Sequence, residues 1–93
     1  MRCFMFRIWG KIFSENHLIQ DMVYENEDFS LNRTKKVFAG LHEFCLAFDL
    51  QEPIWLDKNI SEFKRSDKTR FTQDNFIESI EFDYLEIHVI EED

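Results

Sequence analysis

The segment NRTKKVFAGLHEFCLAF, residues 32–48, decides the fold class of this 93-residue chain. Apolar residues recur along it at steps of four, three, one and three, which is the spacing of one helix face. They form a single wide stripe: Val37, Leu41, Phe44, Cys45 and Phe48. The spacing therefore predicts an α-helix over residues 32–48 with one buried face. Either Ser30 or Asn32 could serve as its N-cap.

The residues before this helix favour a β-hairpin. Residues 4–13 (FMFRIWGKIF) alternate, with Phe4, Phe6, Ile8 and Ile12 on one parity and Arg7 and Lys11 on the other. This period of two is typical of a half-buried strand. Ser-Glu-Asn at 14–16 predicts a turn, and HLIQDMVY at 17–24 predicts the returning strand.

Two glycines lie inside these predicted elements. A glycine in a helix costs about 1 kcal/mol relative to alanine, so we expect Gly40 to mark a close approach between helix and sheet. Gly10 lies in the middle of the first strand, and we expect it either to face Gly40 or to mark a β-bulge.

The region after residue 49 is harder to interpret. Pro53 ends any helix, and Ile54-Trp55-Leu56 is a short extended apolar run. Asn59 and Glu62 have the spacing of a capping box, which predicts a short helix over residues 59–66. The competing interpretation is a hairpin around residues 66–68, since residues 69–72 (TRFT) favour a strand.

The segment SIEFDYLEIHVI, residues 79–90, predicts the last strand. Its apolar residues change parity, from Ile80 and Phe82 to Leu85, Ile87 and Val89. Because a one-residue slip moves side chains to the other face, we expect a β-bulge near residues 83–85. Alternatively, residues 76–80 (FIESI) form a helical turn that ends where the strand begins.

Together these elements predict one compact α+β domain spanning residues 1–93. A three-stranded antiparallel sheet, or a four-stranded one if residues 69–72 also pair, packs on one long helix. The predicted order is strand, strand, helix, short helix, strand.

The net charge of −8 has an uneven distribution. Residues 71–93 carry eight acidic residues and no Lys or Arg, so the first seventy residues are neutral overall. Arg33, Lys35 and Lys36 stand at the start of the predicted helix, where the helix dipole disfavours positive charge. We therefore expect the C-terminal acids to neutralise either this helix start or the basic segment at 64–70.

The sequence offers no recognisable catalytic or cofactor site. With glycines only at positions 10 and 40, it lacks the clustered glycines of a phosphate-binding loop. His17, His42 and His88 are far apart and have no zinc-site spacing. We expect no catalytic residue, cofactor or metal, and we expect Cys3 and Cys45 to act as small apolar residues in a reducing cytoplasm.

Three surface features are candidate binding sites. Lys64, Arg65, Lys68 and Arg70 alternate with phenylalanines in FKRSDKTRF, residues 63–71, a mixture that single-stranded nucleic-acid sites use. Glu81, Asp83 and Glu86 could form an acidic surface that mimics a phosphate backbone, although most acidic strand faces only keep an edge soluble. Met5 and Trp9 could mark an apolar patch on the second sheet face, and so a homodimer interface.

Three stretches resemble those of a small bacterial family of uncharacterised proteins of similar length. They are RIWGKIF at 7–13, PIWLDKNISEFKR at 53–65 and RFTQDNFIESIEFDYLEIHVIEED at 70–93. The resemblance implies a stand-alone bacterial protein and brings no activity or site residue with it.

The sequence thus favours a non-enzymatic cytoplasmic protein that binds another protein or itself, with no membrane partner. An acidic inhibitor that mimics nucleic acid is the alternative function. A weak nucleic-acid or anion binder acting through residues 63–71 is the third.

Overall fold

The computed structural model describes residues 5–28 and 30–92. Within these ranges the chain forms one antiparallel sheet, with strand order β2-β1-β4-β3, and two α-helices. The elements are β1 (Phe6–Ser14), β2 (His17–Asn26), α1 (Arg33–Ala47), α2 (Asp57–Ser66), β3 (Lys68–Phe71), the 3₁₀ turn η1 (Gln73–Asn75) and β4 (Tyr84–Glu92). The α+β class is confirmed, and the sheet has four strands, which is the alternative to three that the sequence leaves open. The predicted order is incomplete because it omits β3 between α2 and β4. Cys3, Phe4 and Asp93 lie outside the described residues.

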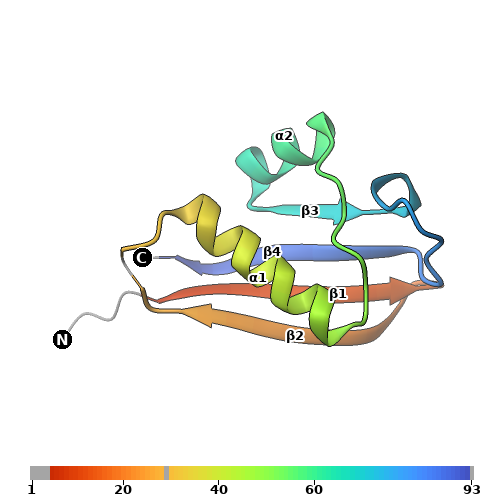
Figure 1. The fold of residues 1–93 in the computed structure, drawn as a ribbon, viewed down its shortest axis with the longest axis horizontal. Coiled ribbons are helices and arrows are strands. Elements are labelled where there is room, and N and C mark those ends of the chain that lie inside the picture. The colour runs from red at the N-terminus through yellow and green to blue at the C-terminus, as the bar shows by residue number, and fades with distance from the viewer. Residues whose placement is uncertain (1–4, 29, 93) are drawn as a thin grey trace.

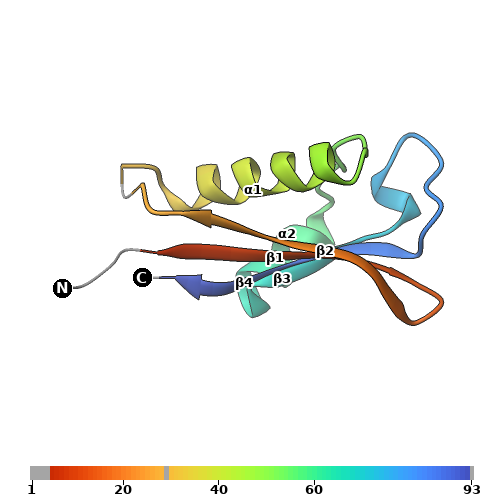
Figure 2. The same cartoon turned by 90° about the horizontal axis from the view of Figure 1, so that it is seen from below.

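The two helices occupy different places around the sheet. α1 lies against one face, where it contacts β1 and β2, and Figure 2 shows it as a separate layer above the strands. α2 lies beyond β3 at the sheet's edge (Figure 1). Between α1 and the sheet lies the core, to which β1 contributes Phe6, Ile8 and Ile12, and β4 contributes Leu85 and Ile87.

The predicted N-terminal hairpin is confirmed. β1 and β2 pair from Phe6 opposite Asn26 to Ser14 opposite His17, which leaves a two-residue turn. Its residues, Glu15 and Asn16, both have positive φ, at 51° and 67°. Two such residues match the right-handed twist of the flanking strands, so the turn fixes the register of the pair.

The predicted long helix is also confirmed, and Asn32 is its N-cap. The side-chain oxygen of Asn32 accepts a hydrogen bond of 2.9 Å from the backbone nitrogen of Lys35. Ser30 instead bonds Asp28 in the preceding turn. The apolar stripe is buried on the sheet as expected, except that Phe48 is only half-buried and forms the C-cap.

Both glycines permit a close approach, but they do not face each other. A Cβ at Gly10 would lie 2.7 Å from the Phe44 ring, and one at Gly40 would lie 2.9 Å from the Tyr24 ring. The expectation that Gly10 faces Gly40 or marks a bulge is wrong, because each glycine receives an aromatic side chain from the opposite layer. These contacts set the spacing between α1 and the sheet.

The predicted short helix forms and residues 68–71 form a strand, but the competing hairpin around residues 66–68 is wrong because α2 occupies the residues before Asp67. α2 forms and runs through Asp67, which has φ of 59°, directly into β3. The proposed capping box is wrong, because Leu56 is the N-cap and Asn59 lies inside the first turn. The left-handed conformation at Asp67 ends the helix and lets the chain return beside it.

The last strand is shorter than expected. β4 begins at Tyr84, after the change of parity, so the residues before it belong to a loop and need no bulge. The predicted bulge at 83–85 is therefore wrong. The register shift between β1 and β4 lies at the other end, between Arg7 and Ile8, where Ile90 has no partner. Residues 76–80 are not helical either, since η1 ends at Asn75.

Two fully buried asparagines join α2, β3 and the connecting segments. The amide oxygen of Asn59 accepts from the backbone of Leu56 and from the Asn75 amide, while its nitrogen donates to Thr69 Oγ1 and to the Arg70 carbonyl. The Asn75 amide also donates to the Ile54 carbonyl. A buried amide with all its hydrogen bonds made specifies one arrangement, because any other leaves polar groups unpaired.

We predict that Gly10→Ala destabilises the fold by about 1–3 kcal/mol, because the new methyl group overpacks against Phe44. Urea unfolding measures the change. Phe44→Leu in the same chain should recover part of the loss by shortening the opposing side chain. Equal stability of Gly10→Ala and the native chain would contradict the close approach.

We predict that Asn59→Ala lowers the free energy of unfolding by more than about 2 kcal/mol. The substitution removes the side-chain amide and leaves its buried hydrogen-bond partners unpaired. The matched control is Ser61→Ala on the exposed side of the same helix, which should change stability by less than about 0.5 kcal/mol. If both substitutions have the same effect in urea unfolding, the amide network does not hold α2.

Candidate functional site

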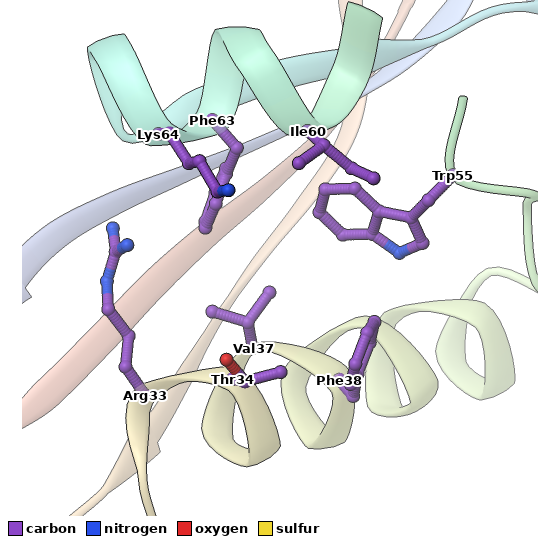
Figure 3. A pocket seen from close by; sticks show the side chains of 8 residues that line it. All are labelled: Arg33, Thr34, Val37, Phe38, Trp55, Ile60, Phe63 and Lys64. Atoms are coloured by element: carbon purple, nitrogen blue, oxygen red, sulfur yellow. The ribbon is translucent and has the colours of Figure 1, made fainter. Parts of the chain in front are cut away.

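A cleft of about 320 Å³ lies between the two helices. It exists because α1 packs over β1 and β2 while α2 packs beside β3. Its lining residues come from three segments: Arg33, Thr34, Val37 and Phe38 of α1, Trp55 of the connection, and Ile60, Phe63 and Lys64 of α2. Figure 3 shows these side chains facing the space from both helices, with Trp55 at one end and the two cations at the other.

The interior of the cleft is aromatic. The Trp55 ring meets Phe38, Phe63 and Phe71 edge to face, with centroid distances of 6.0, 5.6 and 5.0 Å. Phe38 remains 50% exposed and Ile60 41% exposed. Large apolar side chains that stay exposed beside a hollow are typical of a binding surface.

Trp55 also provides an unused hydrogen-bond donor. Its indole Nε1 is buried and has no acceptor in the described part of the chain. A buried donor of this kind normally finds a partner. The apolar lining of the cleft is thus accompanied by one polar group that the fold leaves unsatisfied.

The two cations at the other end have different surroundings. Arg33 contacts Asp67 at 2.6 Å and Glu92 at 3.1 Å, and its guanidinium lies 5.0 Å from the centre of the Phe63 ring. Lys64 is exposed and has no ion pair or hydrogen bond within residues 5–28 and 30–92. The charge of Arg33 is shared with two carboxylates, so Lys64 carries the available positive charge.

The predicted basic patch is divided between two places. Lys64 lines the cleft, whereas Arg65, Lys68 and Arg70 line a separate polar depression of about 180 Å³. Arg70 is already bonded to Glu86 at 3.0 Å. The four cations therefore line two different depressions.

The predicted acidic surface is also divided. Glu86 is buried between two cations, with Lys11 Nζ at 2.9 Å and Arg70 Nε at 3.0 Å. Asp83 accepts a hydrogen bond of 2.8 Å from the backbone of Glu15 in the hairpin turn. Glu81 remains exposed and lines another depression, so the three carboxylates have three different surroundings.

The open sheet face around Trp9 is covered by polar contacts. The Trp9 indole donates to Asp21 at 2.9 Å, and the Lys11 ammonium lies 4.1 Å from the centre of the Trp9 ring. Met5 precedes β1 and is half-buried. The neighbours of Trp9 on this face also include Val23, its cross-strand partner on β2, which is exposed. A homodimer through this face stays a prediction.

The C-terminal acids neutralise the chain's own cations, as the charge distribution predicts. Glu92 pairs with Arg33 at the helix start, Glu86 pairs with Arg70, and Glu91 lies 2.9 Å from Arg7 on β1. The acidic segment therefore forms ion pairs both with the start of α1 and with the basic segment at 64–70.

Burial in the core changes the chemistry of the Cys45 thiol. Cys45 is buried, and this burial, with a smaller contribution from Glu52, raises the pKa of its thiol to about 11. A thiol of this kind is unreactive at neutral pH. Within the described ranges, no group of three or more His, Cys, Asp or Glu side chains is placed to hold a metal ion.

Neither described helix has the length and apolarity that a membrane crossing requires. Comparison of the chain with family models, with curated proteins and with solved structures gave no match. The resemblance to a bacterial family and the cytoplasmic location both stay predictions.

The residues that line the cleft have no recognisable pattern in the sequence. Phe38 and Ile60 lie outside the buried stripes of their helices, and Trp55 lies in an irregular segment. The only signal was the number of aromatic residues, fifteen in all, counting eleven Phe, two Trp and two Tyr. That number exceeds what one helix and a small sheet can bury.

We predict that Glu86→Gln destabilises the fold by about 1–3 kcal/mol at neutral pH, because it leaves Lys11 half-buried without its counter-charge. Burial alone would raise the pKa of Glu86, but hydrogen bonds from Lys11 and Arg70 outweigh it and hold the pKa below its ordinary value. A lowered pKa stabilises the fold above the pKa of the unfolded chain, and this contribution disappears as the pH falls through the lower, folded pKa.

The difference in unfolding free energy between the native chain and Glu86→Gln should therefore shrink on acidification below about pH 4. Urea unfolding across this range measures it, with the exposed Glu78→Gln as the control. A difference independent of pH would show that the charge of Glu86 does not stabilise the fold.

Proposed function

We propose that this chain is a small non-enzymatic module that binds another protein through the cleft between α1 and α2. The observation that carries the proposal is the apolar, aromatic-walled cleft with Phe38 and Ile60 exposed at its sides. Aromatic residues around a hollow are the usual anchors of protein interfaces. Its volume is at the lower end for small-molecule sites, so it suits one or two side chains of a partner.

The charge at the cleft indicates which partner segment it would accept. Lys64 is the cation there without a counter-charge, since Asp67 and Glu92 already neutralise Arg33. A partner with a large apolar side chain and an adjacent carboxylate would fill the cleft and pair with Lys64.

The other candidate functions receive less support from the geometry. Glu86, Glu91 and Glu92 face cations of their own chain, which leaves fewer charges for mimicry of a nucleic acid. The cations expected to contact nucleic acid are divided between two sites. Cations that line two different depressions support binding of single-stranded nucleic acid less well than one continuous basic groove would.

A peptide-display selection against the immobilised protein tests the proposal. We expect the selected peptides to share a large apolar residue with an Asp or Glu close to it. Phe38→Asp and Ile60→Asp should each weaken binding of a selected peptide by about tenfold or more, which corresponds to about 1.4 kcal/mol.

The matched control is Leu46→Asp, which changes an exposed apolar residue of α1 that does not line the cleft. Lys64→Glu should change the selected preference from acidic to basic residues. Peptides that bind Phe38→Asp and Ile60→Asp as well as they bind the native chain would rule out the cleft as the binding surface.

A further inference from the structure

The two edges of the sheet are not equivalent. Along β3, the outward-facing carbonyl of Arg70 accepts a hydrogen bond of 2.9 Å from the Asn59 side chain, so α2 covers that edge. β2 forms the other edge, and the described chain places no strand beyond it (Figure 1). An uncovered edge presents main-chain donors and acceptors to any extended segment.

The backbone groups that point outward from β2 follow from the alternation of hydrogen bonds across the sheet. The Phe13 carbonyl of β1 accepts from Asp83 on the β4 side, so the even-numbered residues of β1 bond to β2. Their partners are Gln20, Met22 and Tyr24. The intervening residues Asp21, Val23 and Glu25 therefore direct their N–H and C=O groups away from the sheet.

Two of the usual devices against strand addition, proline and a basic side chain, are missing from this edge. Residues 17–26 contain no Pro, Lys or Arg. A register shift opposite Ile12 and Phe13 disturbs only the hairpin end of β2, which leaves residues 20–26 in regular pairing. Val23 is 43% exposed at the middle of this regular part. The edge is thus long enough and regular enough to receive a strand.

The charges beside the edge specify the partner. Asp21 and Glu25 lie on either side of Val23, about 13 Å apart at 3.3 Å per residue. Two further acidic residues, Glu27 and Asp28, follow them in the sequence. Arg7 lies 3.9 Å from Glu25 but only 2.9 Å from Glu91, so Glu25 is weakly neutralised. Asp21 accepts from the Trp9 indole through Oδ2, which leaves its Oδ1 available.

We propose that the β2 edge binds an extended basic segment of a partner protein as a fifth strand. Two cations four residues apart on that segment would lie opposite Asp21 and Glu25. An apolar residue midway between them would lie opposite Val23. Directly opposed pairs on one face of an antiparallel ladder contribute most to such recognition.

A second copy of this chain fits the edge less well. In a two-fold pairing centred on Val23, Asp21 of each copy would lie opposite Glu25 of the other, and a pairing centred on Tyr24 would oppose Asp21 to Glu27. A pairing centred on Asp21 would oppose that residue to itself. The net charge of −8 on each copy adds to the repulsion.

The test uses the full chain and a labelled peptide, Thr-Lys-Thr-Val-Thr-Lys-Thr, with fluorescence anisotropy as the measurement. We expect binding of this peptide and not of its twin with Glu in place of Lys. N-methylation of the central Val removes an N–H that would face β2, and it should weaken binding by about tenfold or more. N-methylation of a neighbouring Thr, whose N–H faces away, should change binding by less than about threefold.

Charge reversal at the edge provides the second measurement. Glu25→Lys should weaken binding of the basic peptide, and Asp21→Lys with Glu25→Lys should favour the acidic twin. The control is Glu78→Lys with Glu81→Lys, which changes the net charge equally but lies in the loop before β4. Lys64→Glu, which changes the cleft and not the β2 edge, should not weaken binding of the basic peptide. This result would distinguish binding at the edge from binding in the cleft.

Three outcomes would overturn the proposal. The first is equal binding of the two N-methylated peptides, which would indicate attraction of charges without strand addition. The second is equal loss of binding in the edge and control charge reversals. The third is a dimer of the chain alone, observed by sedimentation and dissociated by Val23→Pro, which would assign the edge to a second copy.

Discussion

The side-chain amide of Asn59 is the contact on which the C-terminal half of the molecule depends. It is fully buried and bonds α2, β3 and the segments before and after them. Because one of its bonds goes to the outer edge of β3, the same residue fixes the helix and covers the strand. The cleft has its shape because α2 is held at the sheet's edge and not over its face.

This arrangement makes the molecule asymmetric in both its edges and its faces. α2 covers one edge, while β2 leaves the other uncovered; α1 covers one face, while ion pairs and the Trp9 indole cover the other. The C-terminal acids form much of this second covering. A strongly acidic chain can therefore have a surface on which many charges are already paired, so its net charge alone says little about its partner.

The N-terminal half of the fold could be predicted from the sequence, because its contacts repeat at a local period. The helix, its Asn32 cap and the hairpin follow from the spacing of neighbouring residues. The C-terminal half could not be predicted in the same way, since Asn59 resembles a cap but bonds Asn75 and Arg70 far along the chain. The cleft was missed for a similar reason: Phe38 and Ile60 belong to no buried stripe, and only the packing of α2 brings them together.

The position of β4 has a consequence for how the chain is made. β4 is the last element along the chain, yet it lies inside the sheet, between β1 and β3. During synthesis the β1–β2 hairpin and α1 emerge before β4, so the inner side of β1 has no partner until β4 has left the ribosome. Such a non-local closing step is slow compared with hairpin or helix formation. The nascent chain therefore exposes a second unpaired strand edge until β4 emerges and pairs with β1.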